Sequence, residues 1–261
     1  MRVDILASGS SGNCMHIGSG TGDILIDAGI SMRRIQAGLG NLGLELDDIS
    51  GVLITHEHSD HVSGLKMLAK HYSMPVYAPH TIANRLRGML PELEPCLRII
   101  RVDEPFALAG LKVTAFHTPH DTDESVGYRV EGDGCFAAAT DLGHVTQTVL
   151  DNLTGADAVL IEANHDVDLL SAGPYPLYLK RRILSERGHL SNESCGRLAR
   201  YLCQHGTRQI ILGHLSRENN RPELALAVVR AQLSELPAEL HCAPPLGGLS
   251  ITVREASPCL R

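Results

Sequence analysis

The chain of 261 residues contains no tryptophan, and aromatic residues make up only 3% of it. This shortage argues against the base-stacking platform of single-strand-binding proteins. No run approaches the roughly 20 apolar residues that a membrane-spanning helix needs. The segment 1–14 carries no long apolar run either, so we expect no signal peptide and a cytoplasmic protein.

The seven cysteines are scattered and include no Cys-x-x-Cys pair. An odd number at irregular spacing argues against a disulfide framework and fits a reducing compartment. Linkers rich in proline or serine, charge blocks and short repeats are also missing. We therefore expect one α/β domain over residues 1–261, a length that suits a single large domain.

The charge balance is acidic, with a formal net charge of −7 when the histidines are neutral. Such a balance normally disfavours a polyanionic partner, so a nucleic acid would have to be held by a local basic patch. The unusual feature of the composition is its 14 histidines, and their positions are therefore informative.

Apolar and β-branched runs closed by turn residues predict strands, and segments with helical spacing fill the gaps between them. The strands cluster in two groups, each accompanied by helices, which favours two sheets packed face to face with helices outside. The expected strands are about 2–7, 14–17, 23–27, 51–55, 75–78, 98–102, 111–117, 126–131, 134–140, 157–162, 208–213 and 249–254. The expected helices are about 31–39, 62–72, 80–89, 145–153, 176–187, 191–205 and 221–235.

Five apolar strands run directly into a histidine or an acidic residue, namely His56, His117, Asp141, Glu162 and His214. If the carboxyl ends of these strands meet, they form a pocket lined with metal-ligand chemistry at the usual ligand position of α/β proteins.

The run that begins at His56 has the densest cluster of ligand groups. His56, His58, Asp60 and His61 place three imidazoles and a carboxylate within six residues, enough to serve two metals from one loop. These ligand types suit zinc, manganese or iron(II). A solvent-facing polar loop is the alternative, but the run lies between a buried strand and a helix, where unliganded groups would be desolvated competing charges.

The pattern His-x-His-x-Asp-His after an apolar strand resembles the signature of the metallo-β-lactamase superfamily. This resemblance implies a four-layer αβ/βα sandwich of two mixed sheets with outer helices. It also implies two divalent metal ions, each with three ligands, joined by a bridging carboxylate that holds the cations together despite their repulsion. The implied ligands are His56, His58 and His120 for one ion, Asp60, His61 and His214 for the other, and Asp141 for the bridge.

His117 competes with His120 for one of these ligand positions. We prefer His120, because the family pattern places an aspartate after this histidine, as in His120-Asp121.

Within the superfamily the chain resembles the YycJ/WalJ family, which implies a 5′-to-3′ exonuclease acting on double-stranded DNA. One departure follows Asp121, where the family has Ala and then Asp-Pro but this chain has 122–125 as Thr-Asp-Glu-Ser, and it bears on substrate preference. Ribonuclease Z is similar in part, at Glu162 and 188–191. The segments that carry the YycJ/WalJ resemblance are 8–13, 25–29, 55–61, 140–143, 162–166, 175–176, 179–180, 188–192, 212–216 and 219–220.

His189 is a candidate proton donor, because ribonuclease Z-like enzymes place a phosphate-handling histidine in such a segment before a helix. Glu162 would hold this imidazole protonated, and Asp60 would orient the attacking hydroxide as well as bind metal. The alternatives are a surface capping segment for His189 and a structural role for Glu162.

Two segments are candidates for substrate binding. Ser11 and Asn13 lie in a Gly/Ser loop whose N–H groups could meet a phosphate, although a plain turn is the alternative. Residues 176–200 hold six basic side chains against two glutamates. They surround His189 and predict a phosphate-backbone contact, with a solvated helix face as the alternative. The substrate-binding residues expected here are Lys180, Arg181, Ser191 and Asn192.

The sequence thus predicts a phosphodiester hydrolase that acts on nucleic acid, with DNA as the expected substrate. It would use two divalent ions, Zn or Mn, with Fe as a further option. The alternative is a hydrolase of a small cyclic phosphodiester, lactone or thioester with the same centre, since a fold does not determine the substrate. A purely structural metal site needs four ligands and no bridge, so seven ligands argue against it.

Overall fold

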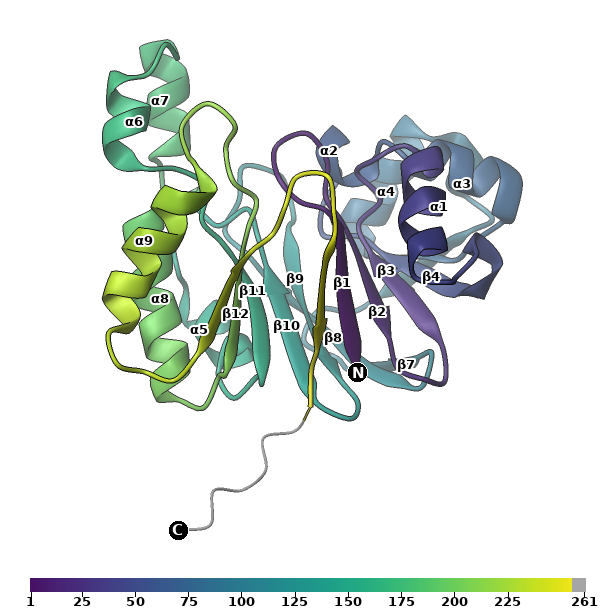
Figure 1. The fold of residues 1–261 in the computed structure, drawn as a ribbon. Helices are drawn as coiled ribbons and strands as arrows, with labels where there is room; N and C mark the ends of the chain where they lie inside the picture. The colour runs from purple at the N-terminus through teal and green to yellow at the C-terminus, as the bar shows by residue number, and fades with distance from the viewer. Residues whose placement is uncertain (255–261) are drawn as a thin grey trace.

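The computed structural model describes residues 1–254, which form two seven-stranded mixed sheets packed face to face (Figure 1). The first sheet has the order β14 (Leu249–Thr252), β1 (Arg2–Ala7), β2 (Cys14–Gly18), β3 (Asp23–Ile26), β4 (Ile49–Leu53), β5 (Val76–Pro79) and β6 (Leu97–Ile100). The second has the order β13 (Glu239–Cys242), β12 (Gln209–Gly213), β11 (Ala158–Glu162), β10 (Cys135–Ala139), β9 (Val126–Glu131), β8 (Leu111–His117) and β7 (Phe106–Leu108).

Helices cover the outer faces of both sheets and complete four layers (Figure 1). The helices beside the first sheet are α1 (Met32–Asn41), α2 (Ser59–Val62), α3 (Leu65–Tyr72) and α4 (His80–Met89), with 3-10 turns η1 (Leu46–Asp48) and η2 (Pro91–Leu93). Those beside the second sheet are α5 (Gln147–Leu153), α6 (Val167–Ala172), α7 (Leu177–Ile183), α8 (Asn192–Gln204) and α9 (Pro222–Leu233). The predicted fold class is therefore confirmed.

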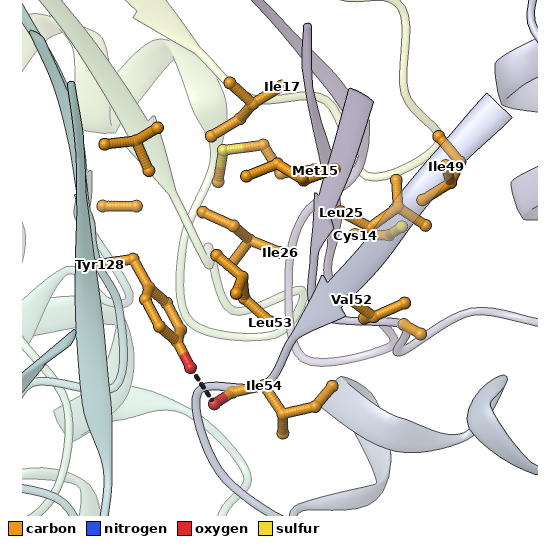
Figure 2. Close-up of a cluster of buried hydrophobic side chains, with 14 of the residues drawn as sticks. Cys14, Met15, Ile17, Leu25, Ile26, Ile49, Val52, Leu53, Ile54 and Tyr128 are labelled. Carbon is orange, nitrogen blue, oxygen red and sulfur yellow. Dashed lines mark hydrogen bonds between the residues drawn. The ribbon is translucent and has the colours of Figure 1, made fainter. Parts of the chain in front are cut away.

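The main core lies between the sheets, where side chains such as Ile26, Leu53 and Met15 pack together (Figure 2). A polar contact also crosses this interface: the Tyr128 hydroxyl donates a 2.7 Å hydrogen bond to the carbonyl oxygen of Ile54. Burial raises the pKa of Tyr128, so the phenol stays neutral and remains a donor. This bond ties the second sheet to the segment just before His56.

The sequence-based assignment erred at a few elements. The strands β7 and β13 lie at the edges of the second sheet and were not expected, and neither was α6. The expected helix 62–72 begins later, as α3, and the short helix α2 precedes it. Gly64 separates the two helices, and its N–H donates to the Ala28 carbonyl oxygen at 2.8 Å. A Cβ at Gly64 would lie 2.3 Å from the carbonyl oxygen of Ile30, so this close approach requires glycine.

Two further expectations concern membranes and disulfides. Among residues 1–254, no helix is both long enough and apolar enough to cross a bilayer. The six cysteines in this range are free thiols, and Cys259 lies outside the described residues.

Candidate metal centre

The loop after β4 carries the first group of ligand candidates. The chain leaves the sheet at Leu53 and reaches His56, which is fully buried. His58 is the N-cap residue of α2, and this helix then presents Asp60 and His61 in its single turn. The rings of His56 and His61 lie 4.1 Å apart between centroids, so the turn folds the imidazoles back onto one another.

The second sheet supplies the other candidates, each just beyond the carboxyl end of a strand. His120 follows β8, Asp141 follows β10 and His214 follows β12. Asp141 and His214 have left-handed φ angles of 58° and 55°. Non-glycine residues hold this conformation at a cost of order 1–3 kcal/mol, and such residues cluster at functional sites.

These side chains meet in compact sets whose ligand atoms lie within 4.8 Å of one another. Asp141 faces both sides of the centre: its Oδ2 lies 3.3 Å from His61 Nε2, and its Oδ1 lies 3.6 Å from His120 Nε2. The structure thus brings together the two sets of three that the sequence pattern implied, with Asp141 between them. The sets are His56, His58 and His120; Asp60, His61 and His214; and His56, His61 and Asp141.

Unsatisfied polar atoms test whether a metal fits here. His56 Nε2 and Asp141 Oδ2 are buried and have no hydrogen-bond partner among residues 1–254. Leaving buried polar atoms unpaired costs about 1–3 kcal/mol each, and more when the group is charged. Imidazole and carboxylate atoms in these positions are suitable ligands for divalent ions, which would also balance the buried carboxylates. The residues therefore fit divalent metal ions.

Asp27 orients the candidate ligand His61 by binding the ring nitrogen that faces away from the centre. The sequence analysis assigned no such role to Asp27. Its Oδ2 lies 2.7 Å from His61 Nδ1, and its Oδ1 accepts the Thr55 N–H at 2.9 Å. This pairing turns Nε2 of His61 toward the centre. Burial opposes protonation of His61, but Asp27 and Asp141 outweigh it and raise its pKa to about 10. The sequence does contain a signal that could have identified this residue, because Asp27 is an acid that directly follows the apolar strand β3.

Glu162 positions two imidazoles at once. Its Oε1 lies 2.8 Å from Nδ1 of His189 and 2.8 Å from Nδ1 of His214. Its Oε2 accepts the N–H groups of Leu142 at 2.8 Å and Leu190 at 2.9 Å. Burial would raise the pKa of Glu162, but the charge and hydrogen bond of His189 lower it to about 2.

His189 keeps a partly exposed ring, with 23% of its side chain accessible. Burial favours the neutral imidazole, but Glu162 outweighs this effect and raises the pKa of His189. The side chain also joins Asp141, Glu162 and His214 in a fourth compact set. Because Nδ1 faces Glu162, Nε2 is the ring nitrogen left for a substrate.

The two competing histidines at the end of β8 and just beyond it lie in different surroundings. His117 has a side chain that is 56% exposed and lies 4.0 Å from Glu124. His120 has a side chain that is 2% exposed and shares a compact set with His56 and His58. The geometry thus favours His120 at the centre.

The residues expected to bind substrate make different contacts in the structure, and some of them are buried. Asn13 is buried, with Nδ2 3.4 Å from Asp60 Oδ2, so it holds Asp60 rather than presenting a free amide. Asn192, expected to bind substrate, is fully buried and donates to Asn220 Oδ1 at 3.0 Å, so its side chain does not face solvent. Ser191 caps α8, and exposed Ser11 accepts a 2.7 Å hydrogen bond from Arg217.

The basic segment is partly engaged in internal contacts. The Arg182 guanidinium contacts the carboxylate of Asp121, whose Oδ1 lies 3.2 Å from His120 Nε2. Lys180 Nζ donates to the Ser171 carbonyl oxygen at 2.7 Å, and Arg187 Nε donates to that of His120 at 2.7 Å. The exposed Arg181 makes no side-chain hydrogen bond or ion pair with residues 1–254.

Solved structures of known proteins share this architecture. YhfI from Bacillus subtilis, a metallo-beta-lactamase fold protein, superposes with a TM-score of 0.75 at 15% identity, over 96% of this chain and 98% of that one. The short form of human tRNase Z superposes with a TM-score of 0.65 at 17% identity, over 97% and 99% of the two chains. At these identities the likeness concerns the fold.

Proteins that are similar in sequence identify the family of this chain more narrowly than the fold does. Exodeoxyribonuclease YycJ of Bacillus anthracis is 36% identical over 237 residues, which cover 90% of each chain. Exodeoxyribonuclease WalJ of Streptococcus pneumoniae is 36% identical over 238 residues, or 90% of this chain and 88% of that one. Residues 23–215 match the family described as the beta-lactamase superfamily domain. The chain belongs to the beta-lactamase superfamily, and within it to the family that includes YycJ and WalJ.

Proposed function

We propose that this chain is a metal-dependent exodeoxyribonuclease that removes nucleotides from the 5′ end of double-stranded DNA. The observation that carries the proposal is the pair of three-ligand sets facing Asp141, in a chain 36% identical over most of its length to proteins named exodeoxyribonucleases. The alternative, a small-molecule hydrolase, is less supported, because the relatives that cover 90% of the chain carry nuclease names.

The proposed ligands are those that the sequence pattern implied, with zinc or manganese as the ions. His56, His58 and His120 would hold one ion, while Asp60, His61 and His214 would hold the other. Two such ions would activate water at neutral pH and offset the charge that develops on the phosphoryl oxygens.

The protein's own groups would direct the proton transfers. Asp60 Oδ2 lies 3.4 Å from both His61 Nε2 and His214 Nε2, so its carboxylate is fixed at the centre and can orient the attacking water. As the bond between phosphorus and the leaving oxygen breaks, His189 would give its Nε2 proton to that oxygen. Glu162 keeps His189 oriented and favours its protonated form.

The six free thiols within residues 1–254 fit a reducing compartment, and we place this activity in the cytoplasm.

Digestion of end-labelled linear duplex DNA by the metal-loaded protein tests the proposal. A label at the 5′ end should appear in mononucleotides from the first turnover, whereas a label at the 3′ end should remain in shortening strands. A closed circular duplex should persist, because it offers no end. Cutting of the circle, early release of the 3′ label, or hydrolysis of cyclic dinucleotides without attack on DNA would each overturn it.

A further inference from the structure

Helices α6 and α7 form an arm that stands out beyond α8 and α9, at the same end of the molecule as α2 (Figure 1). The start of α7 is unusual for an exposed helix because it presents large apolar side chains. Leu177 is 62% exposed and Tyr178 is 74% exposed. Most of the Tyr178 side chain is therefore exposed to water, in a chain that has six tyrosines and no tryptophan.

The tyrosine lies on the helix that reaches the metal centre. Arg182 of α7 contacts Asp121, which in turn lies 3.2 Å from the candidate ligand His120. Tyr178 precedes Arg182 by four residues, so both side chains share one face of α7, about 6 Å apart along its axis. Arg181, three residues after Tyr178, is its other neighbour on the helix surface.

We propose that Tyr178 stacks on one base of the DNA strand entering the metal centre, with Arg181 contacting the adjoining phosphate. A single exposed ring is enough for this contact, unlike the extended aromatic surface that the composition argues against. An aromatic face flanked by cations is the chemistry by which proteins hold single strands, because every base has a π-face and every linkage a negative charge. The acidic chain makes this local basic helix the complementary surface for a polyanion. The inference rests on the proposed nuclease function and adds how the strand end is held.

If Tyr178 holds a base, the site should bind a polymer in preference to a small phosphodiester. A substrate that spans only the metal centre would not reach one helical turn beyond Arg182. Only a substrate that continues beyond the metal centre can extend along α7 to Tyr178. Stacking should therefore strengthen the binding of DNA about 10-fold or more.

Fluorescence of a base analogue tests this directly. The metal-loaded protein is mixed with a duplex whose 5′ overhang carries one 2-aminopurine between abasic sites. Phosphorothioate linkages at this end slow cleavage, so that binding is observed first. The parent and Tyr178→Phe should quench the fluorescence on binding, whereas Tyr178→Ala should bind about 10-fold more weakly without quenching. Tyr201→Ala removes a partly exposed tyrosine on α8 and should quench as the parent does.

The outcomes separate this inference from the function on which it rests. If the parent degrades DNA but Tyr178→Ala quenches and binds like the parent, the stacking contact is refuted while the nuclease stands. If the parent neither binds nor degrades DNA, both fail. A sedimentation coefficient that falls to that of a monomer in Tyr178→Ala alone would instead assign this face to a second copy of the chain and refute the stacking contact.

Discussion

At the scale of single residues, Asp141 lies between the two proposed sets of metal ligands. It is 2% exposed and adopts a left-handed backbone conformation, and its oxygens lie within 3.6 Å of ring nitrogens from both ligand sets, namely those of His61, His214 and His120. Nothing among residues 1–254 satisfies its Oδ2 through a hydrogen bond. A carboxylate in this position is best explained by cations on both sides.

Replacing Asp141 with alanine should therefore lower the metal content from two ions per chain and abolish DNA hydrolysis. Elemental analysis after gel filtration measures the first effect, and release of labelled nucleotides measures the second. Asp133→Ala, which removes an exposed acid elsewhere, is the matched control. An unchanged metal content in Asp141→Ala would rule out the bridging role.

His189 should affect turnover without affecting metal content. Its Nδ1 is held at 2.8 Å by Glu162, which leaves the other ring nitrogen for proton donation. His189→Ala should lower kcat about 10²–10⁴-fold, the usual contribution of a general acid. His117→Ala, at an exposed histidine, should leave both quantities unchanged. Loss of metal from His189→Ala would make this residue a ligand and would require that His120 or His214 be reassigned.

At the scale of elements, a buried histidine joins three strands of the first sheet. His16 of β2 lies 2.8 Å from Asp4 of β1 through Nδ1 and 2.7 Å from Asp23 of β3 through Nε2. Ser250 of β14 also contacts Asp4. The strand pattern of the sequence does not reveal which charged neighbours flank His16, because they come from two other strands.

Asp4→Asn should lower the free energy of unfolding by about 1.5–3 kcal/mol at neutral pH, since it weakens charge-assisted bonds in a buried place. Burial opposes ionisation of Asp4, but His16, Ser250 and Arg2 outweigh it and hold its pKa below the usual 3.8. Its stabilisation is therefore present above about pH 3.8 and is lost as the pH falls through the folded value. Urea unfolding across this range should show the parent and variant converging in acid. A constant difference at every pH would contradict the ionic role.

The arm formed by α6 and α7 carries three basic side chains on α7. Of the cations on α7, Lys180 and Arg182 already have protein partners, whereas Arg181 has none among residues 1–254. Arg181→Ala should reduce the slope of log affinity against log salt for duplex DNA by about 0.9, the value for one phosphate contact. Arg33→Ala, on the exposed side of α1, serves as the control. A slope identical to that of the parent would show that Arg181 is merely solvated.

At the scale of the whole molecule, the metal centre joins the two halves of the sandwich. His56, His58, Asp60 and His61 follow β4 of the first sheet, whereas the remaining proposed ligands follow strands of the second. Ions held by both groups would link segments that otherwise meet through the apolar core and a few contacts such as that of Tyr128 with Ile54.

Chelation should consequently lower the thermal unfolding midpoint. An ion at about 100 times its dissociation constant stabilises the folded chain by about 2.7 kcal/mol. For a domain of this size that corresponds to a shift of roughly 5–10 °C. Calorimetry with and without a chelator measures the shift, and Asp141→Ala should show a smaller one. Identical midpoints for the parent in both conditions would mean that the ions do not link the halves.

Much of this organisation follows from local sequence signals. Apolar periodicity predicts most strands and the outer helices, because side-chain spacing reports directly on which face of an element is buried. The density of ligand types between His56 and His61 indicates a metal site before any contact is known. Acids and histidines at the ends of apolar strands, such as Asp141 and His214, point to the same edge, since parallel strands bring their carboxyl ends together.

The tertiary structure alone decided which residues those signals bring into contact. It buried the side chain of Asn192 and paired His61 with Asp27. It also joined Arg182 to Asp121, which lie 61 residues apart in the chain. Periodicity describes a residue only relative to its own strand or helix. The contacts between strand ends and the α7 arm instead depend on how two sheets and their helices pack, and that packing is set by the whole core at once.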